Sequence, residues 1–215
     1  MKTTIAAVVA TTALFALPAH SATVTVDFEG VSSFASIAEF YNGGTDSEGV
    51  AGPSFGVSFG GDALVFQNDE LGPYFSNAPS GNSVMAAVGP DAAFNFAAGF
   101  MSMASFYYSS YADLGVGLYS GLNGSGSLLG SFMLVSNAER ACTESAFCNW
   151  DLATVSFDGV ARSIAFGDTA GFAAFDDVSV SPYQSVPEPG ALALLGLGLA
   201  GLGASKLRRS RKSAA

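Results

Sequence analysis

Hydrophobic and polar residues alternate with a period of two along most of this chain, in short runs separated by glycine, asparagine, aspartate and proline. Successive side chains of a β-strand point to opposite faces, so this alternation predicts half-buried strands joined by turns. Strands are expected at residues 23–28, 56–60, 63–66, 83–88, 92–96, 101–108, 114–119, 128–135, 152–157, 162–166 and 172–180.

Many short strands at close spacing are typical of a β-sandwich or barrel. The sequence therefore predicts an all-β domain over residues 22–183, folded as a two-sheet, jelly-roll-like β-sandwich. Helical periodicity is not sustained in this range, although residues 32–41 could hold one short helix. Asn123-Gly124 lies between two expected strands and favours a hairpin turn there.

The N-terminus has the three parts of a secretory signal peptide. Lys2 supplies the positive charge, residues 5–17 are apolar, and Ala19 and Ser21 place small residues at a peptidase site. We expect signal peptidase to cleave after Ser21 and remove residues 1–21. A buried N-terminal helix is the alternative, but a strand pattern begins immediately afterwards.

The C-terminus predicts a membrane anchor. Residues 190–205 are uncharged and rich in leucine, glycine and alanine. As a helix they would extend about 24 Å, a minimal span for a hydrocarbon core of about 30 Å. The segment after it, residues 206–215, should stay in the cytoplasm because of its positive charge. The basic residues are Lys206, Arg208, Arg209, Arg211 and Lys212.

A short motif precedes this helix. Pro187-Glu188-Pro189 closes a linker at residues 184–189, and with the helix and the arginine-rich tail it resembles the PEP-CTERM sorting signal of Gram-negative bacteria. The resemblance implies processing by an exosortase. The precursor would be anchored in the inner membrane, and the product would reach the cell surface or extracellular matrix. An ordinary anchor with a proline-rich stem is the alternative, and no Leu-Pro-x-Thr-Gly sortase motif is present.

The negative charge of the expected domain excludes nucleic acids as partners. Residues 22–186 contain two arginines and 17 carboxylates, a net charge of −15. Affinity for nucleic acids comes largely from cations that displace counterions from phosphate, so this domain should not bind them.

The same composition restricts catalysis. The single histidine, His20, falls in the expected signal peptide, and residues 22–186 contain no lysine. Nucleophilic triads, histidine-ligated zinc and Schiff bases are therefore excluded from the mature domain. Only a glycosidase-type pair of carboxylates is chemically open, and no motif marks such a pair. We therefore expect no enzymatic activity.

Cys142 and Cys148 are the only cysteines. In an exported protein they should form a disulfide that closes a small loop and contributes about 2 kcal/mol. A zinc site is the alternative, but two thiolates without further ligands are too few for it.

The 17 carboxylates of residues 22–186 cannot all pair with two arginines, so some of them could bind Ca²⁺. If the first and last strands are neighbours, Glu29, Asp176 and Asp177 come together, and oxygen ligands of this kind suit Ca²⁺. The period of two places Asp176 on the side of Val178 and Val180, hence toward the core. The alternatives are a bulge that lets Asp176 reach solvent, or capping of nearby backbone N–H groups. Apart from this structural calcium, no cofactor is expected.

The first and last strands, ending in Asp27-Phe28-Glu29 and containing Phe175-Asp176-Asp177-Val178, loosely resemble those of lectin-like and carbohydrate-binding β-sandwich domains. A structural or adhesive role at the cell surface is the main functional prediction. The alternative that the resemblance implies is a calcium-assisted module binding extracellular polysaccharide. Its aromatic platforms would be residues 106–111, Tyr119 and Trp150.

Overall fold

Nine strands and one short 3-10 helix make up the described part of the chain, residues 22–70, 72–140 and 143–183 of a computed structural model. The helix is η1, Gly167–Thr169. The strands are β1 (Val24–Val26), β2 (Val57–Phe59), β3 (Ala63–Gln67), β4 (Ser83–Ala87), β5 (Ala93–Ser110), β6 (Leu114–Tyr119), β7 (Leu128–Leu134), β8 (Asp151–Ala165) and β9 (Ala173–Pro182).

All pairing between these strands is antiparallel, and the prediction of an all-β domain is confirmed. The strand order is β3-β4-β9-β5-β8-β6-β7, with β1 paired to β9 and β2 paired to β5. The nine strands thus form one continuous sheet, whereas two separate sheets were expected. This sheet is consistent with a β-sandwich because it bends into two layers.

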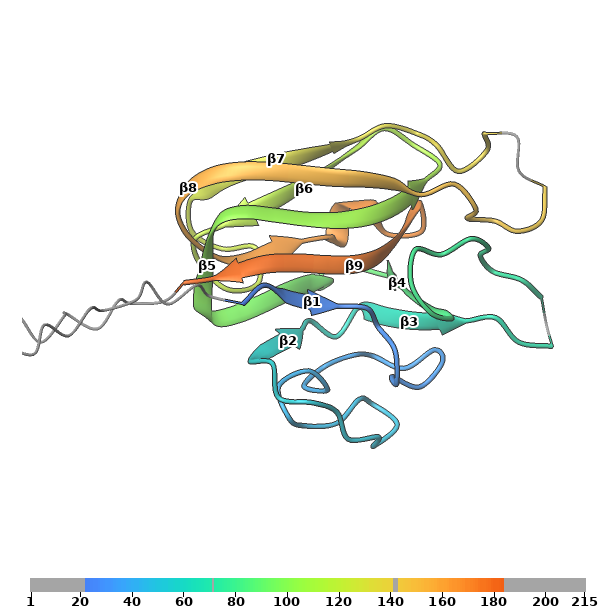
Figure 1. The fold of residues 1–215 in the computed structure, drawn as a ribbon, viewed down its shortest axis with the longest axis horizontal. Helices are drawn as coiled ribbons and strands as arrows, with labels where there is room; N and C mark the ends of the chain where they lie inside the picture. Colours follow the sequence, from blue (N-terminus) through green and yellow to red (C-terminus); the bar gives the residue numbers. More distant parts are fainter. Residues whose placement is uncertain (1–21, 71, 141–142, 184–215) are drawn as a thin grey trace, which may run out of the picture. The chain divides into compact units, whose positions relative to one another are not determined.

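The bend lies in the two longest strands, β5 and β8. Gly99 and Gly159 interrupt them with φ angles of +86° and +91°, a region that side chains with a Cβ rarely adopt. Figure 1 shows both strands folding back at the same end of the domain. The sequence predicted four strands here, at residues 92–96, 101–108, 152–157 and 162–166. They are instead two strands whose ladders continue through bulges.

Each layer takes one part of each long strand. In one layer, the first part of β5 pairs with β2 and with the last part of β8. This last part of β8 pairs in turn with β6. The second part of β5 and the first part of β8 pair with each other, and this part of β5 also pairs with β9. Phenylalanine rings fill the space between the layers. Phe106, for example, lies 4.4 Å from Phe132 and 5.3 Å from Phe175 between ring centroids.

The short helix considered for residues 32–41 is absent. Phe34 and Ala38 have φ angles of +60° and +46°, which end any right-handed helix. This segment instead hydrogen-bonds to β3, with the Phe34 N–H donating to the Val65 carbonyl at 2.7 Å and the Ile37 N–H to the Ala63 carbonyl at 3.1 Å. Pairing with a sheet edge satisfied these backbone groups better than an isolated helical turn.

The expected hairpin is present. Asn123 and Gly124, with φ angles of +54° and +67°, lie in the connection between the paired strands β6 and β7. The expected signal peptide and transmembrane helix, residues 1–21 and 190–205, lie outside the described residues. Within the described ranges, no helix is long and apolar enough to cross a membrane.

Candidate functional site

Several of the predicted site residues fall outside the described part of the chain. These are the sorting motif Pro187, Glu188 and Pro189, the basic residues Lys206, Arg208, Arg209, Arg211 and Lys212, and Cys142. Cys148 is buried, with its Sγ atom 3.8 Å from the Ala138 carbonyl oxygen. No described cysteine is free, and the bridge between Cys142 and Cys148 stays a prediction.

The first and last strands are neighbours, as the calcium hypothesis requires. Val24 pairs with Val180 and Val26 with Val178. This pairing places the carboxylates that follow β1 next to those within β9. Backbone N–H groups of the loop at residues 80–83 donate hydrogen bonds to a carboxylate of each set, Glu29 after β1 and Asp176 within β9.

Asp176 is fully buried. Its carboxylate accepts hydrogen bonds from the Ser80 N–H at 3.0 Å, the Ser80 hydroxyl at 3.1 Å and the Asp177 N–H at 2.8 Å. Burial raises the pKa of Asp176 to about 7, and the neighbouring Asp177 charge adds to this rise. Asp176 therefore caps backbone N–H groups, one of the alternatives considered for it.

A bulge decides which side of β9 Asp176 occupies. Asp177 has a φ angle of +51°, and the pairing of β5 with β9 changes register between Ser105 and Tyr107. The bulge puts Phe175 in the main core with Val178, although the two are three positions apart. The strict alternation assumed for this strand was therefore wrong at Asp177, while the burial expected for Asp176 is present.

Glu29 holds the same loop. Its Oε1 atom accepts hydrogen bonds from the Asn82 N–H at 2.7 Å and the Ser83 N–H at 2.8 Å. A Cβ on Gly81, whose φ angle is +46°, would displace the end of the Glu29 side chain from this position. Glu29 and Asp176 thus accept hydrogen bonds from N–H groups of the protein itself. Among the described residues, no group of three or more histidine, cysteine, aspartate or glutamate side chains could hold a metal ion.

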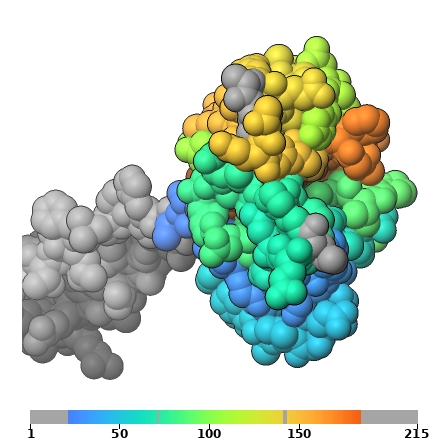
Figure 2. All heavy atoms as spheres, turned by 90° about the vertical axis from the view of Figure 1, so that its right-hand side faces the viewer, coloured from blue at the N-terminus to red at the C-terminus, as the bar shows by residue number. Residues whose placement is uncertain are grey.

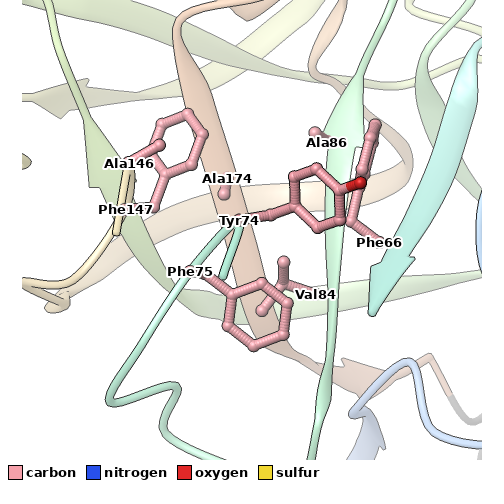
Figure 3. A pocket seen from close by; sticks show the side chains of 8 residues that line it. All are labelled: Phe66, Tyr74, Phe75, Val84, Ala86, Ala146, Phe147 and Ala174. Carbon is pink, nitrogen blue, oxygen red and sulfur yellow. The ribbon is translucent and has the colours of Figure 1, made fainter. Parts of the chain in front are cut away.

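An apolar pocket of about 120 Å³ lies at the end of the domain where two loops meet. Figure 2 views this end and shows residues 72–82 lying against residues 143–150. Four aromatic rings line the pocket, those of Phe66, Tyr74, Phe75 and Phe147, together with the small side chains of Val84, Ala86, Ala146 and Ala174. In Figure 3, Tyr74 and Phe66 face Phe147 and Ala146 across it.

Hydrogen bonds between the loops hold the pocket open. The Ser76 N–H donates to the Phe147 carbonyl at 2.8 Å, and the Phe147 N–H donates to the Tyr74 carbonyl at 3.3 Å. The Trp150 indole N–H donates to the Ser76 carbonyl at 2.9 Å. On the other side of the pocket, the Asn68 side chain accepts the Tyr74 N–H at 2.9 Å. The backbone around the pocket is therefore fixed before any ligand arrives.

Carboxylates lie on both loops that form this pocket. Partial burial raises the pKa of the Tyr74 hydroxyl, and Asp69 raises it further by its charge and by accepting a hydrogen bond. Asp69 therefore lies beside a ring that lines the pocket. Glu70 follows it, and Glu144 lies two residues before Ala146; both glutamates are exposed. The interior of the pocket is therefore apolar, and one carboxylate, that of Asp69, contacts the hydroxyl of a lining ring.

A row of four hydroxyl side chains crosses β1, β9, β5 and β8. Thr25 pairs with Ser179. Ser179 pairs with Ser105, and Ser105 pairs with Thr154. The two hydroxyl oxygens of Thr25 and Ser179 lie 2.8 Å apart and form a hydrogen bond. Neighbouring strands are about 4.8 Å apart, so the row is about 14 Å long.

Beside this row, the residues of β5 and β8 are uncharged, whereas on β9 the row of Tyr107 continues to Asp176. Met103 pairs with Ser156, and Tyr107 pairs with Leu152, each two positions from the hydroxyl row and on the same face. Met103 and Leu152 are exposed. We call this surface the hydroxyl face, made of Thr25, Met103, Ser105, Tyr107, Leu152, Thr154, Ser156 and Ser179.

One end of the hydroxyl face opens into a shallow depression. The depression has a volume of about 320 Å³ and is lined by Ser102, Ser156, Phe157 and Asp158. Ser102 has a φ angle of +72°, in the left-handed region that serine rarely adopts. The bulges of β5 and β8 thus place two hydroxyls, a carboxylate and a ring edge around one hollow.

Alternation predicted that the outward residues of these strands are polar, but it could not predict their register.

Most of the aromatic residues expected from the sequence to be platforms for sugar binding are unsuitable for that role. Phe106 is fully buried and Tyr108 is 5% exposed. Trp150 is half-buried and donates its indole N–H to the protein, and Tyr111 packs against Phe147 with 5.2 Å between ring centroids.

Comparison with solved structures finds distant similarity to β-domains that bind sugars or act in adhesion. A family 6 carbohydrate-binding module from Clostridium stercorarium, solved with cellobiose, is 17% identical with a TM-score of 0.37, covering 58% of this chain and 85% of the module. The K2 cleaved adhesin domain of Lys-gingipain is 13% identical with a TM-score of 0.48, covering 74% and 99%.

A third similar structure is an arabinoxylan arabinofuranohydrolase of glycoside hydrolase family 43 from Bacillus subtilis. It is 16% identical with a TM-score of 0.41, and the match covers 65% of this chain but only 31% of the hydrolase. These identities and TM-scores are too low to transfer any activity to this chain. A search of curated proteins finds no significant match.

The end of the chain matches a protein family. The model of the PEP-CTERM protein-sorting motif matches residues 185–209, which include Pro187-Glu188-Pro189 and the first arginines of the tail. This match confirms the resemblance noted in the sequence. Residues 185–209 are a PEP-CTERM protein-sorting motif, which marks an exported protein that is anchored in the membrane before processing.

Proposed function

We propose that this chain is an exported, non-catalytic protein of the cell surface or extracellular matrix, and that its β-domain adheres to neutral polysaccharide through the hydroxyl face. The observation that supports this proposal best is the row of paired hydroxyls across four strands. The sorting motif supports the location, because it marks an exported protein that is anchored in the membrane before processing.

The chemistry of the hydroxyl face suits an uncharged sugar polymer. Serine and threonine hydroxyls both donate and accept hydrogen bonds, as sugar hydroxyls do. The exposed side chains of Met103 and Leu152 offer apolar surface for the C–H groups of a sugar ring. The strands give an extended polymer a contact surface about 14 Å long with a depression at its end.

The negative charge of the domain also restricts the kind of polymer that it can bind. With two arginines and 17 carboxylates in residues 22–186, the domain repels polymers that carry uronate, phosphate or sulfate groups. Catalysis is not part of the proposal because these residues include no histidine and no lysine. A carboxylate glycosidase is the catalytic alternative, and new reducing ends released from a bound polymer would favour it.

The adhesion proposal is tested by affinity electrophoresis of the full chain in gels containing soluble glucan, mannan, xylan or polygalacturonate. Retardation is expected by at least one neutral polymer and not by polygalacturonate. Replacing Thr25 and Thr154 by valine removes two hydroxyls while keeping side-chain shape, so retardation should fall. Thr45→Val is the matched control, since Thr45 is exposed on a different loop. Absence of retardation in every gel would favour a purely structural role.

The sorting part of the proposal needs a separate test. Exosortase recognition of Pro187-Glu188-Pro189 predicts that Glu188→Ala leaves the unprocessed precursor in the inner membrane. Intact mass of the surface form should lack the segment after the motif. Wild-type surface protein that retains residues 190–215 on most molecules would contradict processing.

A further inference from the structure

The aromatic-lined pocket is separate from the hydroxyl face. None of the eight residues that make up the hydroxyl face lines it. Both sites include a residue of β9, but Ala174, in the pocket, precedes Ser179, on the hydroxyl face, by five positions, or about 17 Å of strand. A ligand of the pocket therefore does not have to be the polymer that the hydroxyl face binds.

The floor of the pocket is made of two methyl groups. Ala86 on β4 is paired with Ala174 on β9, and the side chains of directly paired residues lie on the same face with Cβ atoms about 5 Å apart. In Figure 3 the aromatic side chains stand around these two alanines. They are the rings of Phe66, Tyr74, Phe75 and Phe147. A small floor between aromatic walls has the shape of a slot for one flat ring.

Phe34 holds two of these walls in place. Its ring makes T-shaped contacts with both, its centroid lying 5.1 Å from that of Phe66 and 5.6 Å from that of Tyr74. The φ angle of Phe34 is +60°, in the left-handed region that a bulky residue adopts only at a cost. The hydrogen bond from the Phe34 N–H to the Val65 carbonyl keeps the backbone in this conformation. The walls of the pocket are therefore set before a ligand arrives.

The lining of the pocket selects an uncharged, apolar ligand. The surface that the described residues contribute to it is apolar, and Asp69 already engages the Tyr74 hydroxyl. A sugar or a carboxylate placed inside would lose its hydration without gaining hydrogen-bond partners. The net charge of −15 on residues 22–186 adds repulsion of anions.

The size of the pocket limits the ligand to one ring. Its volume of about 120 Å³ is close to the roughly 150 Å³ of an apolar cavity that holds one benzene molecule. Water finds few hydrogen-bond partners in such a cavity, so an apolar ring displaces it readily. An aromatic ring also makes edge-to-face contacts with the surrounding rings, which a saturated ring of similar size does not.

We propose that this pocket binds a free, uncharged molecule with a single aromatic ring. The ring lies over Ala86 and Ala174 and between Tyr74 and Phe147, where its edges and faces contact the aromatic walls. The backbone of the pocket is held by the hydrogen bond between Ser76 and Phe147 and needs no rearrangement.

The chain carries its own reporter for this test. Trp150 is the only tryptophan in the sequence, and it packs against an apolar cluster that includes Phe75 and Ala174 of the pocket. The full chain is placed in liposomes of neutral lipid, which contain no tryptophan. Toluene and methylcyclohexane are supplied as vapour at fixed partial pressure, so that uptake by the lipid does not change their concentration in the water. Benzoate is added in solution.

Toluene is expected to change the Trp150 emission saturably. It should also raise the melting temperature, because it binds the native state only. Edge-to-face contacts should make toluene bind about 2- to 10-fold more tightly than methylcyclohexane. Benzoate should bind at least about 100-fold more weakly than toluene, because its carboxylate would lose hydration in the pocket.

Three variants locate the binding. Ala146 is exposed and lines the pocket, so Ala146→Phe should block it and abolish the response to toluene. Ala98→Phe adds the same ring at an exposed position on β5 that does not line the pocket, and it should respond as wild type. Phe147→Leu keeps an apolar wall but removes one aromatic ring, so toluene should lose part of its advantage over methylcyclohexane.

Three results would overturn the proposal. They are the absence of a saturable response of the wild type to toluene, binding of toluene no tighter than that of methylcyclohexane or benzoate, and an unchanged response in an Ala146→Phe chain that melts as wild type does. Should Ala146→Phe unfold, Phe147→Leu decides, because an unchanged preference for toluene would put the ring at another site. No polysaccharide is present in these measurements, so failure of adhesion through the hydroxyl face does not affect them.

Discussion

The buried carboxyl of Asp176 should make the stability of the domain depend on pH in an unusual direction. Its pKa is about 7 in the folded state and 3.8 ordinarily. Between these values the unfolded chain has released this proton while the folded chain still holds it. The folded state then binds more protons, so stability falls as pH rises from about 4 to about 7.

The size of the effect follows from the same values. A rise from 3.8 to about 7 corresponds to about 4 kcal/mol of unfolding free energy lost across the window. The hydrogen bonds from Ser80 and the Asp177 N–H favour the charged form, and the pKa of about 7 already includes them. Residues 22–183 contain no histidine, so no imidazole titrates in this window.

Asp176→Asn isolates this contribution. The wild-type carboxyl accepts the Ser80 N–H on one oxygen and the Asp177 N–H on the other, whereas asparagine has a single side-chain oxygen and leaves one of these donors unpaired, at a cost of about 1 kcal/mol. The variant should therefore be slightly less stable than wild type at pH 4.5 and more stable at pH 8.

The assay is urea unfolding of residues 22–183, without reducing agent, at half-unit steps from pH 4 to 8. Wild-type free energy of unfolding should decline by a few kcal/mol more than that of Asp176→Asn. Parallel profiles for the two proteins would refute the reasoning, because they would mean that Asp176 is ionised in the folded state throughout this range.

Three further predictions concern the same region and the loops. Gly81→Ala should destabilise the domain by about 1 to 3 kcal/mol, because the new Cβ would displace Glu29 from two backbone N–H groups; an unchanged melt would contradict this contact. The calcium hypothesis predicts a melting temperature higher by at most about 5–10 °C in millimolar Ca²⁺ than in chelator, with Mg²⁺ as control, and identical melts would refute it. A disulfide between Cys142 and Cys148 predicts that the intact mass of the oxidised domain rises by about two hydrogens on reduction, whereas an unchanged mass would show free thiols.

Sequence pattern predicted the strands well because their alternation reflects burial on one face. The pairing of β1 with β9 confirms the expected neighbourhood of the terminal strands. Strand continuity was harder to predict. Gly99 and Gly159 suggested turns between strands, but both ladders continue past them, since a glycine can bend a strand without ending it.

The candidate sites depend on contacts that no local pattern contains. Phe75 and Phe147 form a bridge across 72 residues of sequence, and the pocket exists only because their loops meet. The hydroxyl row depends on the register of four strands, of which β1 and β9 are separated by most of the domain. Apolar loop residues and outward hydroxyls were visible in the sequence, but their juxtaposition was not.

Adhesion through the hydroxyl face is tested most directly by comparing the affinity of the wild-type chain and the Thr25→Val, Thr154→Val variant for a soluble neutral polysaccharide. Each lost hydroxyl should remove about 0.5–1.5 kcal/mol of hydrogen bonding, so binding should weaken about 5- to 150-fold. The melting temperature should fall by only a few degrees, through loss of the surface hydrogen bond between Thr25 and Ser179. Equal affinity of the two proteins, with Thr45→Val as control, would contradict the assignment of this face.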